Sequence, residues 1–428
     1  MTSLILVASW VLLGFGIAAK QGFYNTLDIV RVTAALALLT FVLFRRRPMT
    51  GRLRTGALTV AFAAVIYGTL RYPSGYHAEG GWLTASRAVS VVAALLAATW
   101  VVVPSRFYRR HLWAPVTLLV MVAGVFLVVA SPAPQIDVWY VVDQGVERTL
   151  EGGNAYDMVF VGSPAENDAY PYLPASLLVL APFKALFGDA RYGYLVAMAV
   201  GAWFVHRTAR PAVGGALAIL LLLYPRMLFG IEQAWTEPLL VGGFAAMVYL
   251  VVTGRAGWAV VAFAFVLASK QHMLLVTPLA AAWPAFGVRR TAASAAAAGA
   301  VCLPWFLADP AAFWWDTVEF NFVLPARFDS LSIFTTADNL GWQPPFPLVL
   351  VLTIGAIALA VGKLPRDELG FVFGSAWVLF VFNWLNKQSF FNHYSLVLAL
   401  LVIGLAARDR RAGAAADRSP RVLSEAVS

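Results

Sequence analysis

Apolar residues follow one another in long runs along almost the whole chain, and short polar or charged segments separate these runs. Each run is predicted to be a helix, because a segment in lipid has to satisfy its backbone hydrogen bonds internally. The predicted transmembrane helices span residues 3–19, 27–44, 57–70, 85–103, 113–130, 192–206, 211–224, 235–253, 256–268, 272–286, 291–307, 346–361, 369–384 and 391–407.

One further apolar stretch, 173–187, is not counted as a span. It contains Pro174, Pro182 and Lys184, and its apolar residues favour one face. These features predict a helix that lies in the membrane interface. The resulting fold class is an all-α polytopic membrane protein with about fourteen transmembrane helices.

Composition supports this class and leaves no room for a sizeable soluble domain. Hydrophobic residues make up 61% of the 428 residues and charged residues 12%, whereas charged residues make up roughly a quarter of a soluble domain. The single cysteine, Cys302, excludes a disulfide framework and a Cys/His metal site. The first apolar run lacks a basic segment before it, so we interpret it as a retained helix and not as a signal peptide.

The distribution of charge predicts the orientation. With the N-terminus in the cytoplasm, the cytoplasmic loops and tail hold 20 of the 31 Lys and Arg residues but only 5 of the 22 Asp and Glu residues. This bias agrees with the positive-inside rule and places both termini in the cytoplasm. It also accounts for the net charge of +9 without nucleic acid as a partner.

Two long outer loops divide the chain into segments, and long ordered loops often carry function. The predicted organisation is a five-helix segment (1–130), a first outer loop with interfacial helices (131–191), a transmembrane core (192–307), a second outer loop (308–345), C-terminal helices (346–407) and a disordered basic cytoplasmic tail (408–428).

The strongest candidate for chemistry is Asp137, a few residues after the fifth predicted helix. A carboxylate at the membrane surface could take a proton from an acceptor hydroxyl beside a lipid-borne substrate. The spacing from Asp137 to Glu151 suits a surface helix with its valines on the apolar side. The alternative is a solvated acid that caps the N-terminus of that helix.

Other polar groups fall at the same face, and each has a structural alternative. Lys270 and His272 could hold a lipid phosphate, although Lys270 could equally be a lysine that reaches the interface from a helix end. Glu232 could pair with Arg226 or Lys270, and His393 could be a hydrogen-bonded structural residue. The candidate substrate-binding residues are Tyr140, Tyr156, Tyr170, Glu232, Gln233, Glu237, Gln271, Lys387 and His393, and Arg327 joins the candidate phosphate-binding residues.

The order of these residues resembles the GT-C integral-membrane glycosyltransferases, and within them glycosyltransferase family 87, the polyprenyl-phosphate-mannose-dependent α-mannosyltransferases. The resemblance covers roughly residues 130–400. It differs from the family pattern because the aspartate follows the fifth helix and not the first. The matching residues are Asp137, Tyr140, Gly153-Asn154-Ala155-Tyr156, Tyr170-Pro171 with Pro174, Lys270-Gln271 and Arg327-Phe328-Asp329-Ser330.

The resemblance implies a GT-C-like core and an inverting transfer outside the cytoplasmic membrane. The sugar, most commonly mannose, would come from a polyprenyl-phosphate donor and pass to a lipid or glycan acceptor. Asp137 would be the general base, and Lys270, with His272 or Arg327, would receive the leaving phosphate. No cofactor is expected, although Asp137 with Glu232 or Glu237 could hold a divalent cation. The alternative function is a transporter or flippase of a lipid-linked sugar, whose pathway would need ionisable groups near the bilayer midplane.

Overall fold

A computed structural model describes residues 1–45, 53–163 and 169–425, with side chains up to Ala415. Helices and the loops between them make up this part of the chain. Its one sheet-like pairing is an isolated antiparallel bridge between Phe23 and Ser330. The prediction of an all-helical protein is therefore confirmed for the described residues.

The helices follow the predicted apolar runs closely. They are α1 (Thr2–Ala18), α2 (Thr26–Phe44), α3 (Thr55–Arg71), α4 (Gly80–Val102), α5 (Arg106–His111), α6 (Trp113–Ala130), α7 (Asp137–Leu150), α8 (Ala175–Phe187), α9 (Arg191–Thr208), α10 (Pro211–Leu222), α11 (Met227–Glu232), α12 (Glu237–Val252), α13 (Ala256–Leu267), η1 (Gln271–Val276), α14 (Thr277–Ala282), α15 (Gly287–Ala308), α16 (Pro310–Trp314), η2 (Trp315–Glu319), α17 (Phe320–Val323), α18 (Ile333–Asn339), α19 (Phe346–Lys363), α20 (Glu368–Leu385) and α21 (Phe391–Glu425).

Seven segments of the described chain are long and apolar enough to cross a membrane. Several shorter apolar helices, including α1, α3, α10, α12 and α13, accompany them. Helices of this kind characterise a multi-pass membrane protein. The seven segments are α2, α4, α5 with α6, α15, α19, α20 and the first part of α21.

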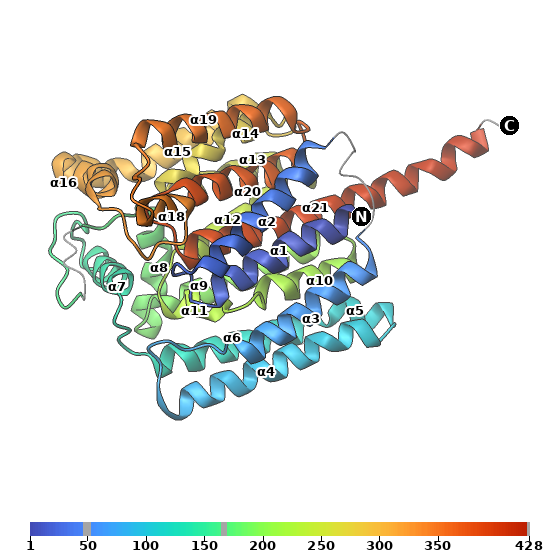
Figure 1. Ribbon diagram of the computed structural model, residues 1–428, viewed down its shortest axis with the longest axis horizontal. Helices are drawn as coiled ribbons and strands as arrows, with labels where there is room; N and C mark the ends of the chain where they lie inside the picture. The colour runs from blue at the N-terminus through green and yellow to red at the C-terminus, as the bar shows by residue number, and fades with distance from the viewer. Residues whose placement is uncertain (46–52, 164–168, 426–428) are drawn as a thin grey trace.

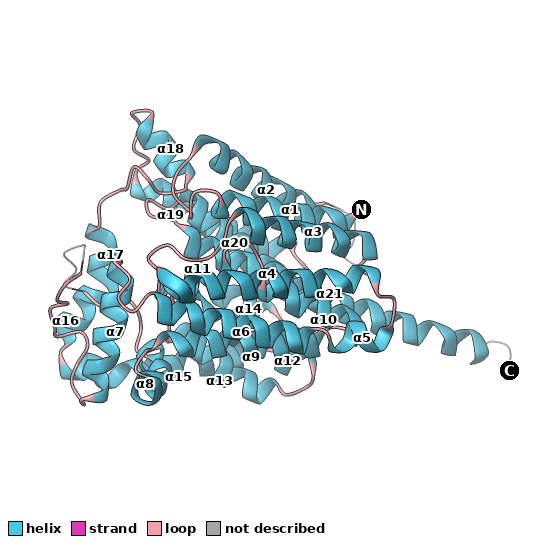
Figure 2. Ribbon diagram, turned by 90° about the horizontal axis from the view of Figure 1, so that it is seen from below, coloured by secondary structure: helices cyan, strands magenta, loops and turns pink. Residues whose placement is uncertain are grey.

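The helices run side by side, and the short helices of the two long loops gather at one end of the bundle (Figures 1 and 2). This end, which we call the loop end, holds α7 and α16 to α18. Both chain termini lie toward the opposite end, which we call the terminus end (Figure 1). Candidate residues from distant parts of the sequence are thereby brought to one end.

Burial shows which helices form the centre of the bundle. In the 18-residue apolar segment of α21, 94% of the residues are buried, and in the corresponding segment of α20 the share is 72%. The corresponding value is 17% for both α15 and α19, so these helices lie at the periphery. The apolar outer faces of the peripheral helices suit contact with lipid.

Two predictions need correction. The helix predicted at 272–286 is a 3-10 helix, η1, followed by the short α14, and Pro278 lies at the start of α14, where its missing N–H costs least. The tail predicted to be disordered from residue 408 instead begins inside α21. There the buried Arg408 donates to Ser3, and the buried Asp409 pairs with Arg210 at 2.6 Å, which holds this turn against the bundle.

Candidate functional site

The helix that carries Asp137 is amphipathic, as predicted. Val141, Val142 and Val146 of α7 are buried, and Asp137 is its first residue. Asp137 is half-buried, and its Oδ1 accepts a hydrogen bond from the N–H of Val138 at 2.8 Å. The N-terminus of a helix favours a negative charge. The position of Asp137 therefore suits a carboxylate that remains accessible at the loop end.

A buried arginine fixes the chain where α7 begins. Arg191, at the start of α9, pairs with Asp189 at 2.6 Å and donates to the carbonyl oxygen of Ser131 at 2.7 Å. Its guanidinium carbon also lies 6.0 Å from the centre of the Trp139 ring. Arg191 thus connects the segment after α6, the first turn of α7 and the N-terminus of α9. In the sequence, Arg191 was identified only as the last residue of the first outer loop.

A second ion pair joins α7 to α8, the predicted interfacial helix. Lys184 donates to both carboxylate oxygens of Asp143 at 2.8 Å. Burial raises the pKa of Asp143 from its ordinary value, and the hydrogen bond from Lys184 partly opposes this change. This pair holds the two helices of the first long loop in a fixed relation.

A buried ion pair at the loop end joins Glu237 and Lys270. Glu237 opens α12 and Lys270 precedes η1, and the Lys270 Nζ donates to Glu237 Oε1 at 2.5 Å. Asn392, at the start of α21, donates to the same oxygen at 3.1 Å. The other carboxylate oxygen, Oε2, is buried and has no hydrogen-bond partner in the described part of the protein. A buried acceptor without a partner is costly, so this atom is a natural contact point for a ligand hydroxyl.

Two histidines lie close to this pair. The ring centres of His272 and His393 are 6.0 Å apart, and His272 stacks on Phe382. His393 Nδ1 accepts from the N–H of Phe390 at 3.4 Å. The structure therefore brings the predicted residues Glu237, Lys270, His272 and His393 together from three separate segments of the chain.

Tyr172 lies close to this cluster. The Lys270 Nζ is 5.3 Å from the centre of the Tyr172 ring. Burial raises the pKa of Tyr172 well above its ordinary value, and the nearby carboxylates of Glu237 and Asp137 raise it further. Tyr172 is thus a neighbour of both candidate acids. The sequence pattern singled out the flanking Tyr170 and Pro174 but not Tyr172.

Other predicted residues have structural partners. Glu232 does not pair with Arg226 or Lys270, because its carboxylate accepts the backbone N–H groups of residues 76–78 at 2.8 to 3.0 Å. Gln271 donates to the carbonyl oxygens of Pro171 and Thr317. Gln233 is buried next to Glu232, and its Nε2 has no partner in the described chain.

The predicted tyrosines are also accounted for by local contacts. Tyr156 and Tyr170 are buried, and their hydroxyl groups bond to the carbonyl oxygen of Tyr172 and to Ser176, both at 2.9 Å. Tyr140 is half-buried, and its hydroxyl accepts from Gln135 at 3.0 Å. Tyr156 and Tyr170 thus support the loop, whereas Tyr140 lies near its surface.

Arg327 and Lys387 lie at the rim of the site. Arg327 pairs with Asp329 at 2.6 Å and its guanidinium carbon is 4.6 Å from the centre of the Phe390 ring. Lys387 donates to the carbonyl oxygens of Phe322 and Leu324. Lys387 therefore fastens the second long loop to the chain before α21, and Arg327 is connected to His393 through Phe390.

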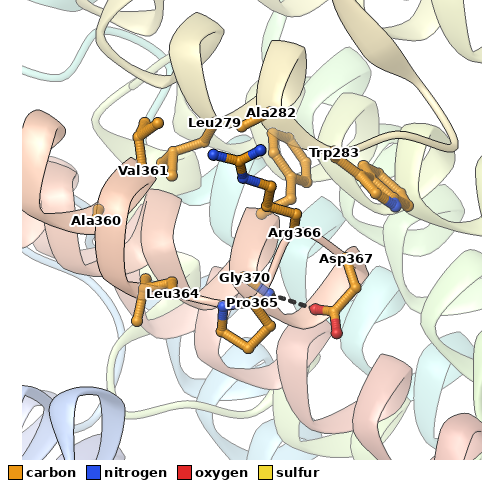
Figure 3. Close-up of a pocket in the computed structure, with 11 residues that line it drawn as sticks. Leu279, Ala282, Trp283, Ala360, Val361, Leu364, Pro365, Arg366, Asp367 and Gly370 are labelled. Carbon is orange, nitrogen blue, oxygen red and sulfur yellow. Dashed lines mark hydrogen bonds between the residues drawn. The ribbon is translucent and has the colours of Figure 1, made fainter.

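A small hollow at the other end of α19 contains none of these residues (Figure 3). Its polar contacts serve helix ends: Asp367 Oδ1 accepts from the N–H of Gly370 at 3.0 Å, and Asp367 also pairs with Arg411. We assign this hollow to the capping of α20.

Within the described residues, no three His, Cys, Asp or Glu side chains are grouped as a metal site. No known protein family, curated protein or solved structure matches the chain significantly. The chemistry of the site therefore has to be argued from its residues.

Proposed function

We propose that the protein is a membrane glycosyltransferase of the GT-C type. It would transfer a sugar, with mannose as the first candidate, from a polyprenyl-phosphate donor to a lipid or glycan acceptor. The observation that carries the proposal is that the half-buried carboxylate of Asp137 acts electrostatically on Tyr172, whose ring adjoins the buried Glu237–Lys270 pair. A proton acceptor and a cation in the neighbourhood of one tyrosine suit the two ends of a displacement reaction.

The proposed reaction is a single displacement. The acceptor oxygen attacks C1 of the sugar, and its proton passes to the carboxylate of Asp137. The bond between C1 and the phosphate oxygen breaks, and its electron pair leaves with the polyprenyl phosphate. Attack opposite the leaving group inverts the configuration at C1.

The leaving phosphate would be received by Lys270 and His272, with Arg327 at the rim. Because Lys270 is paired with Glu237, its charge is already balanced in the resting protein, and the phosphate would bind to the ammonium protons that Glu237 leaves available. The unpartnered oxygen of Glu237 would accept a hydroxyl of the sugar. This division of roles assigns the buried acid to binding and the accessible acid to proton transfer.

The proposal also includes about fourteen spans with both termini in the cytoplasm, which places the loop end at the outer face. Two features support it: the helices α7 and α16 to α18 gather at one end, and the termini lie toward the other (Figure 1). The basic residues 106–110 belong to α5, which lies away from the loop end (Figure 1).

The test compares the purified protein with Asp137→Asn in lipid vesicles that contain radiolabelled polyprenyl-phosphate-mannose and an extract of envelope lipids. Loss of the base is expected to slow transfer by roughly 10²- to 10⁴-fold. Glu147→Gln is the matched control, because Glu147 is an exposed acid on the same helix. Equal transfer by wild type and Asp137→Asn would refute the role of Asp137.

A further inference from the structure

An open pocket with a cavity volume of about 130 Å³ lies near the loop end. It is formed by the end of α3, the loop that follows it, α4, α6 and the connection from α10 to α11 (Figure 1). It extends from Tyr72 at the loop to Val120, ten residues before the end of α6. At a rise of about 1.5 Å per residue this corresponds to roughly 15 Å along the helices.

Arginines surround the mouth of this pocket. Arg87 and Arg226 line it, and Arg226 lies 5.9 Å from the centre of the Tyr72 ring. Arg71, at the end of α3, lies 5.3 Å from the same ring. Two cations thus lie near one tyrosine, and the half-buried Arg87 lines the same pocket. A half-buried cation in such a region is expensive without an anion.

No ion pair neutralises these charges inside the described part of the protein. None of the three arginines forms an ion pair there, and the lining residues include no Asp or Glu. Glu232 acts on Arg226 electrostatically but forms no ion pair with it, because its carboxylate accepts the backbone N–H groups of residues 76–78. Arg87 donates from Nε to the carbonyl oxygen of Ser74 at 2.8 Å, which leaves its two terminal nitrogens for another acceptor.

Arg226 is held in an unusual conformation. Its backbone is left-handed, with φ of 63°, at the start of α11. Its Nε is buried and has no hydrogen-bond partner in the described chain. A non-glycine residue in this region is uncommon, and such strain is often found at ligand sites. The strained backbone and the unpaired guanidinium coincide at the residue that faces the pocket.

The remainder of the lining is apolar. Leu70, Val91, Val120 and Leu223 continue the pocket along the helices, and 60% of Leu70 is exposed. An arginine fork matches a phosphate, and an apolar channel below it matches an acyl or prenyl chain. A pocket with both features is suited to a ligand that has a phosphate group and a hydrocarbon chain.

We infer that this pocket is a second lipid site, which binds the phosphate of a membrane lipid between Arg87 and Arg226 and its hydrocarbon chain along α3 and α4. The source of the phosphate is either a phosphoglyceride or a polyprenyl phosphate. The inference does not depend on the proposed transferase activity. Tyr224, which lines the pocket and lies near Glu237, separates this site from the buried pair of the first site.

The test measures binding of single lipids to the purified full-length protein in phosphatidylcholine nanodiscs. The probes are phosphatidylglycerol, polyprenyl phosphate and inorganic phosphate. The site is expected to bind one or both anionic lipids in preference to phosphatidylcholine. Arg226→Gln should weaken that binding by roughly tenfold or more, as expected for a hydrogen bond to a charged group.

Arg106→Gln, which changes an exposed arginine near the terminus end, should leave binding unchanged. Arg226→Lys keeps the positive charge but loses the two-pronged guanidinium group, so this variant should bind the lipid with intermediate affinity. It replaces Arg226→Gln in the comparison if that variant does not fold. Preference for phosphatidylglycerol over polyprenyl phosphate, or the reverse, identifies the source. Equal binding of phosphatidylcholine, unchanged binding by folded Arg226 variants, or displacement of the lipid by equimolar inorganic phosphate would overturn the inference. If the protein binds lipid here but transfers no sugar, the proposed transferase function is refuted and the lipid site is not.

Discussion

Replacement of Lys270 by methionine tests whether the buried pair is arranged as described. The Lys270→Met change keeps an unbranched side chain of similar length but removes the ammonium group. Only 2% of the Glu237 side chain and 8% of the Lys270 side chain is exposed. After the change the Glu237 carboxylate would keep only the 3.1 Å hydrogen bond from Asn392, while Oε2 already lacks a partner. Leaving one charge of a buried pair unpaired costs about 3–5 kcal/mol.

The double variant Glu237→Gln/Lys270→Met removes both charges and is expected to recover most of that loss, since neutral side chains of similar volume often replace a buried pair at little cost. The free energy of unfolding of the wild type, both single variants and the double variant would be measured in mixed micelles. A coupling energy of at least about 2 kcal/mol is predicted from the four values. Additive single effects, or a loss below about 0.5 kcal/mol for Lys270→Met, would refute the reasoning.

Two further predictions concern the first loop and the terminus end. Burial raises the pKa of Asp143 above 3.8, so the folded protein binds this proton more tightly than the unfolded chain, and the free energy of unfolding should fall as the pH rises through the folded pKa. Asp143→Asn should flatten that part of the pH profile, and an unchanged profile would contradict the assignment. At the hollow in Figure 3, a Cβ on residue 370 would lie 1.7 Å from the carbonyl oxygen of Pro365, so Gly370→Ala should destabilise the protein by about 3 kcal/mol. Gly362→Ala on the neighbouring α19 meets open space and should be neutral or slightly stabilising in the same melting experiment, and a similar effect of both changes would be evidence against this packing.

The apolar pattern was sufficient to predict most of the fold. Each predicted span except 272–286 corresponds to one helix, and the amphipathic pattern correctly predicted α7 and α8 within the first loop. The break into η1 and α14 was not predicted, because the apolar composition of this segment is the same as that of a continuous helix. Short helices in the second loop, α16 to α18, have too few residues for a periodic signal.

The candidate site could be predicted only in part. The sequence predicted that Lys270, His272 and His393 lie at the same face, and in the structure the rings of the two histidines are 6.0 Å apart. It could not show that the partner of Lys270 is Glu237 and not Glu232, since the two acids are five residues apart and only their packing distinguishes them. The left-handed backbone of Arg226 and the burial of Arg191 are likewise tertiary features without a local signal.

The most direct test of the central claim follows the donor itself. Labelled polyprenyl-phosphate-mannose would be added with an acceptor lipid extract to vesicles that contain the purified protein, and the amounts of intact donor and free polyprenyl phosphate on each side would be measured. A transferase should convert the donor into polyprenyl phosphate and a labelled product, in equal amounts and only with the acceptor present. Movement of intact donor across the bilayer without release of polyprenyl phosphate would contradict the account and establish a transporter.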